Sequence, residues 1–206
     1  MRINLSDNYY ASRAARDLCD VWLSLGDIPQ AVIYAERGVS YAVLAGNDYV
    51  LAGSCAHLAQ AHHLAGKLIK AEKLFHEAEA SQKKSNLGEP FLYSYRGFLF
   101  CDLLLSQGRY GEAFERANRA IEISRRNGWL ADIALDSLPL GRACWLLAPS
   151  DGRNEFTEAM GYLNQAADGL RKAGTQDSLP LGLLARAACY RTQGLFPLAQ
   201  ADLDEV

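Results

Sequence analysis

The stretch QGRYGEAFERA, residues Gln107–Ala117, contains a glycine followed two residues later by an aromatic side chain and five residues later by an alanine. Three other stretches keep this spacing, with an apolar residue two positions after the glycine. They are LGDIPQAVIYA at Leu25–Ala35, AGKLIKAEKLF at Ala65–Phe75 and QGLFPLAQADL at Gln193–Leu203. The glycine and alanine pairs are Gly26 and Ala31, Gly66 and Ala71, Gly108 and Ala113, and Gly194 and Ala199. The opening stretch is therefore one copy of an internal repeat.

A fifth, degraded copy lies in GRNEFTEAMGYL, which keeps Phe156 and Ala159 but has Asn154 in the position of the glycine. Asparagine tolerates a positive backbone φ better than most residues, so we expect Asn154 to stand at this corner. The five alanines follow one another at intervals of 40, 42, 46 and 40 residues. Internal repetition at such a period predicts a solenoid of stacked helical units.

Each copy has the features of a corner between two helices. A glycine can close the first helix in the left-handed conformation. In the first copy Asp27 is placed to cap the second helix, with Pro29 near its first position. So short a connection forces the two helices to lie antiparallel. A small residue follows four of the alanines after seven positions, where it would let a neighbouring helix approach closely. These residues are Gly38, Ala78, Ala120 and Ala166.

The pattern predicts ten helices and essentially no strand, because no segment shows sustained two-residue alternation. The helices are expected near 7–25, 28–45, 48–65, 68–85, 90–107, 110–126, 129–148, 155–173, 178–193 and 196–206. The hexamer DSLPLG occurs twice, at Asp136–Gly141 and Asp177–Gly182. Its second copy is typical of a helix start. Its first copy places Pro139 inside a predicted helix, where proline costs about 3 kcal/mol, so that helix either bends at Pro139 or begins there.

These corners resemble those of the tetratricopeptide repeat (TPR) family, in which two antiparallel helices meet at a glycine followed by an aromatic residue. The resemblance covers nearly the whole chain. It implies an all-α, right-handed superhelical solenoid of about five helix pairs in a single domain spanning residues 1–206. The expected units are 7–46, 47–88, 89–128, 129–174 and an incomplete 175–206. Repeats of about 40 residues resemble the arrays of bacterial signal-transduction ATPases and maltose-regulator-type transcription activators.

Charge and hydropathy exclude several classes of partner. The chain of 206 residues has 21 Lys and Arg against 24 Asp and Glu, so no global basic field would attract nucleic acid or an anionic membrane. The N-terminal MRINLSDNYY lacks the apolar core of a signal peptide. No run approaches the roughly 18 apolar residues needed to cross a bilayer. We therefore expect a cytoplasmic protein without a nucleic-acid or membrane partner.

The five cysteines include no C-x-x-C pair and are expected to be small buried packing residues. They are Cys19, Cys55, Cys101, Cys144 and Cys189. The four histidines, His57, His62, His63 and His76, all lie in the second unit, but the nearest pairs are adjacent or five residues apart. Metal-binding pairs on a helix usually stand three or four residues apart, so neither a metal nor another cofactor is expected.

Motifs of catalysis are also missing from the sequence. It contains no G-x-x-x-x-G-K-[ST] phosphate loop, no G-x-G-x-x-G and no G-x-S-x-G elbow. We therefore expect no enzymatic activity.

In the family that the chain resembles, the first helix of each pair lines a concave face whose projecting residues hold a peptide or protein segment. Mapping from the corner glycines gives eleven such positions, although the register of the fourth unit is open. They are Arg13, Arg16, Asp20, Gln60, His63, Tyr95, Phe98, Asp102, Arg142, Trp145 and Arg191. Their mixture of arginine, aspartate and aromatic residues suits a protein or peptide ligand. For each residue, the alternative is a merely solvated side chain.

The last expected helix reaches only Val206, and no polar capping helix follows it. Solenoids need such caps to stay soluble, so the chain is expected to be part of a longer protein or to cover this end by self-association. The sequence thus favours a non-enzymatic scaffold that binds a protein or peptide. The alternatives are a sensor module of a larger signalling ATPase or transcription regulator, and a metal-dependent enzyme centred on the histidines.

Overall fold

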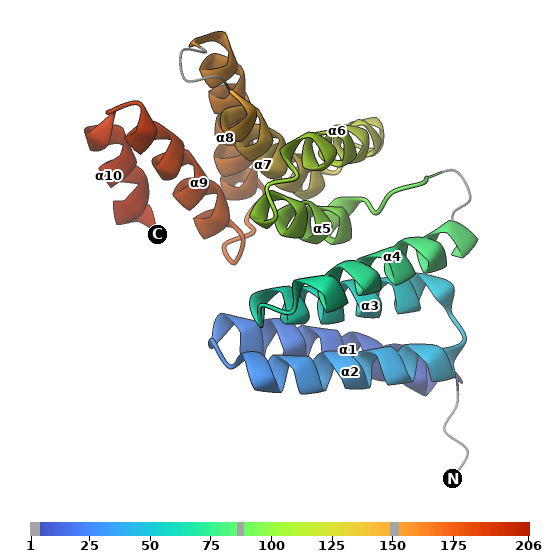
Figure 1. The fold of residues 1–206 in the computed structure, drawn as a ribbon. Helices are drawn as coiled ribbons and strands as arrows, with labels where there is room; N and C mark the ends of the chain where they lie inside the picture. The colour runs from blue at the N-terminus through green and yellow to red at the C-terminus, as the bar shows by residue number, and fades with distance from the viewer. Residues whose placement is uncertain (1–4, 86–88, 149–152) are drawn as a thin grey trace. The chain divides into compact units, whose positions relative to one another are not determined.

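Helices joined by short turns make up the described part of the chain. The computed structural model describes residues 5–85, 89–148 and 153–206, and these ranges contain no strand (Figure 1). The helices are α1 (Leu5–Ser24), α2 (Ile28–Ala45), α3 (Asp48–Leu64), α4 (Leu68–Ser85), α5 (Ser94–Ser106), α6 (Tyr110–Asn127), α7 (Leu130–Leu147), α8 (Arg153–Ala173), α9 (Leu179–Thr192) and α10 (Phe196–Glu205). Apart from the start of α5, every helix end lies within two residues of its predicted position. The predicted all-α solenoid of five helix pairs is confirmed.

The corner glycines adopt the conformation that the repeat pattern predicts. Gly26, Gly66, Gly108 and Gly194 all have a positive φ, from 72° at Gly194 to 77° at Gly26. At the first corner the N–H of Asp27 donates to the carbonyl of Trp22, and the N–H of Gly26 donates to the carbonyl of Leu23. This is a Schellman motif, which satisfies the last carbonyls of the helix while turning the chain. Asp27 then caps α2 by accepting a hydrogen bond from the N–H of Gln30, as predicted.

Two predictions about the fourth unit are settled by α7 and α8. Asn154 lies inside α8 and not at the corner before it, so the corner interpretation of this residue was wrong. Pro139 lies in the middle of α7, which begins nine residues earlier at Leu130. Of the two alternatives for Pro139, a helix start is therefore excluded. In the second DSLPLG copy, α9 begins at Leu179 with a proline in its first turn, close to the prediction.

The fifth helix begins four residues later than the predicted start at residue 90, because the preceding residues are held by α4. The side-chain amide of Gln82 donates to the carbonyl of Phe91 at 2.7 Å. The carboxylate of Glu79 accepts from the N–H of Leu92 at 3.3 Å, and Leu92 is buried. Backbone groups that would start a helix are thus bonded to side chains of α4.

Contacts divide the chain into two units, the N-terminal unit (residues 1–92) and the C-terminal unit (residues 93–206). In the N-terminal unit α1 packs on α2 and α3 on α4, and α1 and α2 both also contact α3. In the C-terminal unit the pairs are α5 with α6, α7 with α8 and α9 with α10, and α7 also contacts α5 and α9. The single repeat domain over residues 1–206 stays a prediction.

Small residues form the contacts within the helix pairs. The repeat alanines Ala31, Ala71, Ala113 and Ala159 are completely buried, and Ala199 is 6% exposed. All five cysteines are buried and free, which confirms their predicted packing role. Burial raises the pKa of the Cys19 thiol to about 12, well above the range in which a thiol is nucleophilic at neutral pH.

One buried polar side chain of the N-terminal unit should limit its stability. His62, on α3, is 1% exposed, and neither of its ring nitrogens has a hydrogen-bond partner among the described residues. Burial, followed by the nearby Lys70 and Lys67, lowers the pKa of His62 from its ordinary 6.5. The unfolded chain therefore takes up a proton at a higher pH than the folded chain does, and stability falls as pH falls through about 6.5.

We predict that His62→Leu raises the free energy of unfolding by about 1 kcal/mol or more, because it removes an unsatisfied buried polar group. The variant should also lose part of the stability decrease seen on acidification. Chemical denaturation of both proteins at about pH 7.5 and about pH 5.5 measures both effects. Equal stability and equal pH dependence of the two proteins would contradict the prediction.

A buried carboxyl group sets the opposite pH dependence in the C-terminal unit. Asp136, on α7, is 1% exposed and accepts a hydrogen bond of 2.7 Å from Oγ of Ser124 on α6. Burial raises the pKa of Asp136 from 3.8 to about 8. Between these values the folded chain holds a proton that the unfolded chain has lost, so stability falls as pH rises.

We predict that Asp136→Asn removes this slope and makes the protein more stable than the wild type at about pH 8, by an amount on the order of a few kcal/mol. Asp177→Asn, which changes the exposed aspartate of the second DSLPLG copy, is the matched control and should keep the wild-type slope. Thermal or chemical denaturation between about pH 5 and about pH 8 measures the difference. A wild-type slope in Asp136→Asn would refute the assignment.

Candidate functional site

The first helix of each pair (α1, α3, α5, α7 and α9; together the first helices) carries a row, polar on all of these helices except α9, beside a buried small-residue row. The small residues are Cys19, Ala59, Cys101, Gly141 and Ala187, all buried. The residues directly after them are Asp20, Gln60, Asp102, Arg142 and Ala188. The small row lets the helices pack closely, so the next row is held at the edge of the packed surface, half exposed.

The eleven predicted binding residues differ in their exposure. Arg13 and Arg191 are exposed, whereas Phe98 is buried, with only 6% of its surface accessible. Phe98 therefore presents little surface to a ligand. The other residues are half-buried: Arg16, Asp20, Gln60, His63, Tyr95, Asp102, Arg142 and Trp145. Half-buried polar groups are positioned by their neighbours and still reach solvent, as a binding surface requires.

In the N-terminal unit the predicted residues of α1 meet α3. Nδ1 of His57 donates to the carbonyl of Gly53 at 2.8 Å, and its Nε2 lies 3.3 Å from Oδ2 of Asp20. The guanidinium of Arg16 lies against Gly53, where an added Cβ would stand 2.1 Å from Nη1 of Arg16. Only glycine leaves room for the guanidinium in this position. Oδ1 of Asp20 and Oε1 of Gln60 are buried atoms without a hydrogen-bond partner among the described residues.

In the C-terminal unit the predicted residues Asp102 and Arg142 form an ion pair between α5 and α7. They stand 40 residues apart, which is one repeat, so each occupies the same position on its own helix. This pairing fixes the register of the fourth unit, which the sequence left open. The rings of Tyr95 and Phe98 are also neighbours, with centroids 6.3 Å apart.

His57 was not among the predicted site residues, although it contacts Asp20. The available signal was the repeat register, because His57 lies one helical turn before Gln60, the counterpart of Asp20 on α3. The exposed His76 lies 3.2 Å from a carboxylate oxygen of Glu79 on its own helix. Within residues 5–85, 89–148 and 153–206, no group of three or more His, Cys, Asp or Glu residues could hold a metal ion.

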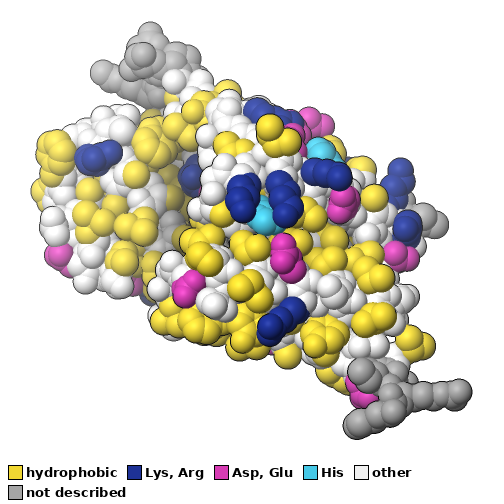
Figure 2. Space-filling view, turned by 60° about the horizontal axis from the view of Figure 1, so that its bottom comes forward, with side chains coloured by type: hydrophobic (Ala, Val, Ile, Leu, Met, Phe, Trp, Pro, Cys, Tyr) yellow, Lys and Arg dark blue, Asp and Glu magenta, His cyan; other side chains and the backbone are white. Residues whose placement is uncertain are grey.

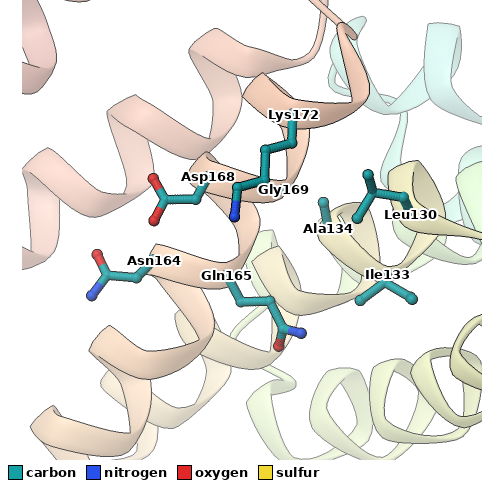
Figure 3. A pocket seen from close by; sticks show the side chains of 8 residues that line it. All are labelled: Leu130, Ile133, Ala134, Asn164, Gln165, Asp168, Gly169 and Lys172. Carbon is teal, nitrogen blue, oxygen red and sulfur yellow. The ribbon is translucent and has the colours of Figure 1, made fainter.

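A second feature, which the sequence did not indicate, is a cavity of about 300 Å³ between α7 and α8 (Figure 3). Its α7 wall is apolar, and its α8 wall is mostly polar. The lining residues are Leu130, Ile133, Ala134, Asn164, Gln165, Asp168, Gly169 and Lys172. Figure 3 shows Asn164 and Asp168 pointing away from the apolar wall. Asn164 accepts a hydrogen bond from Arg186, and Asp168 accepts one from Arg171, so these two side chains are held by neighbouring arginines.

Apolar side chains also gather on α1 and α2. Figure 2, which brings these helices towards the viewer, shows the apolar side chains with scattered charges between them. The exposed residues of these helices and the corner between them include Tyr10, Leu18, Val21, Leu25, Ile33, Tyr41, Val43 and Leu44. In the described ranges, no helix combines the length and the hydropathy needed to span a membrane.

Sequence comparison gives no relative for this chain, since no family model and no curated protein matches it. The fold is similar to those of several solved structures. A Rap protein complexed with Competence and Sporulation Factor has a TM-score of 0.75 at 14% identity, over 99% of this chain and 54% of the Rap chain. The present chain therefore spans about half the length of that protein.

Two other solved structures are similar over nearly their whole length. A putative kinesin light chain from Podosopora anserina, with nearly identical TPR-like repeats, has a TM-score of 0.57 at 20% identity, over 94% of this chain and 93% of that one. MamA from Desulfovibrio magneticus RS-1 has a TM-score of 0.50 at 14% identity, over 95% and 92%. Together with the glycine corners and the helix pairs, these likenesses show that the chain has the fold of TPR-like repeat proteins.

Proposed function

We propose that this protein is a non-enzymatic scaffold that binds a peptide or protein segment along a concave face formed by its first helices. The observation that carries the proposal is the half-exposed row of charged and polar residues beside the buried small-residue row. In the N-terminal unit this row brings Asp20 towards α3, and in the C-terminal unit it pairs Asp102 with Arg142. Such preorganised polar groups next to aromatic side chains suit the recognition of a protein ligand.

The similar structures support binding as the mode of action. The Rap protein was solved in complex with Competence and Sporulation Factor, and its repeats have the same fold as those of this chain. The likeness concerns the fold, so the identity of the ligand and the surface that holds it are proposals for this chain.

A second candidate function is a sensor module that responds to a ligand by a change in its curvature. The division of contacts into two units, with a boundary between Leu92 and Tyr93, favours this candidate, because two units can change their arrangement on binding. Self-association through the apolar surface of α10 also stays a proposal. Phe196, Leu198 and Leu203 are each about half exposed or more on that helix.

The test is a pull-down from the native cell lysate with the full chain as bait. The comparison is a triple variant carrying Arg16→Ala, Tyr95→Ala and Asp102→Ala, which shortens three half-buried side chains of the first helices. We expect a partner that the wild type retains and the variant loses, with a decrease in capture of about tenfold or more. Circular dichroism and a thermal melt establish that the variant is folded.

The matched control carries the same three types of substitution on the second helices of the pairs, as Tyr41→Ala, Arg119→Ala and Asp204→Ala, at exposed positions. It should retain the partner. If both variants retained the partner equally, the binding surface would lie outside the first helices. Capture of no partner by the wild type would favour the sensor module.

A further inference from the structure

Two aspartates at equivalent positions of the two units, Asp20 and Asp102, have different residues one repeat later. Asp20 and Asp102 each stand six residues before a corner glycine, on α1 and α5. One repeat later, the counterpart of Asp102 is Arg142, and the two side chains form an ion pair. The counterpart of Asp20 is Gln60, also 40 residues later, which carries no charge. The chain therefore supplies a guanidinium to the aspartate in one unit and only an amide in the other.

The N-terminal position consequently has hydrogen-bond acceptors that lack donors. Oδ1 of Asp20 and Oε1 of Gln60 are buried and have no partner among the described residues. A buried acceptor without a donor is unfavourable, so a group that donates to it is favoured. The Asp20 side chain is 40% exposed, so part of its carboxylate is reached from solvent.

The neighbouring side chains of His57 and Arg16 do not supply the missing hydrogen-bond donors. His57 donates from Nδ1 to the carbonyl of Gly53 and its Nε2 faces Oδ2 of Asp20, so the ring leaves Oδ1 of Asp20 without a donor. The guanidinium of Arg16 lies against Gly53, one helical turn of α3 before His57 and two turns before Gln60. No described side chain donates to Oδ1 of Asp20 or to Oε1 of Gln60.

We propose that Asp20 and Gln60 form a subsite for a basic side chain, lysine or arginine, of the bound segment. This inference rests on the proposed binding function of the first helices. The basic group of the ligand takes the role in the N-terminal unit that Arg142 has in the C-terminal unit. Lysine and arginine carry donors and no acceptor, which matches a carboxylate and an amide oxygen that both lack donors.

The probe is an array of immobilised short peptides in which one central position holds a single amino acid and the flanking positions hold an equimolar mixture. The labelled full-length chain should be retained about tenfold more by peptides with a central Arg or Lys than by those with a central Leu or Glu. Asp20→Asn should abolish this preference. Gln60→Arg should abolish it too, because the new guanidinium reproduces the pairing of Arg142 with Asp102.

Asp17→Asn is the matched control, since it removes one exposed carboxylate from the same helix, and it should keep the preference. Circular dichroism of each variant shows whether the helices are intact. Peptide binding without a basic preference, or a preference that survives Asp20→Asn, would overturn the subsite while leaving the proposed function standing. Retention of no peptide at all would overturn the proposed function and the subsite with it.

Discussion

The close approach of two antiparallel helices through small residues is the constraint on which the rest of the structure depends. At Ala31, Ala71 and Ala113 the helix surface is completely buried, so a larger side chain would have to push its neighbour away. At Gly141 an added Cβ would lie 2.7 Å from Cγ of Leu163, which leaves no room even for alanine. These contacts fix the rotation of each first helix about its axis. They thereby decide which residues are buried and which stand at the edge of the packed surface.

The polar row of the first helices follows from this geometry, and its chemistry differs between the two units. In the C-terminal unit Asp102 is neutralised by Arg142 of the next first helix. In the N-terminal unit Asp20 contacts the ring of His57, and acceptor oxygens of Asp20 and Gln60 are left without donors. A closed ion pair contributes to the rigidity of a surface, whereas acceptors without donors favour a ligand that supplies them. In our proposal the N-terminal unit therefore holds the recognition site and the C-terminal unit supports it.

Much of the fold could be predicted because the residues that end and start helices are close together in the sequence. A glycine at each corner and an alanine five residues later determine the helix pairs. The start of α5 was wrong because it depends on side chains of α4, Gln82 and Glu79, which bond the backbone before it. For the site, repeat register could place Asp102 and Arg142 on equivalent positions, but their pairing emerged only with the packing of α5 on α7. The cavity between α7 and α8 had no sequence signal, because it depends on how the side chains of the two helices pack.

In our proposal the first helices, and not the second helices, hold the partner. Hydrogen–deuterium exchange of the full chain, with and without the captured partner, is the decisive experiment, because it reports protection along the whole backbone. We expect added protection on α1, α3, α5 and α7, strongest around Asp20 and Asp102. Added protection confined to α2, α4, α6 and α8 would contradict it.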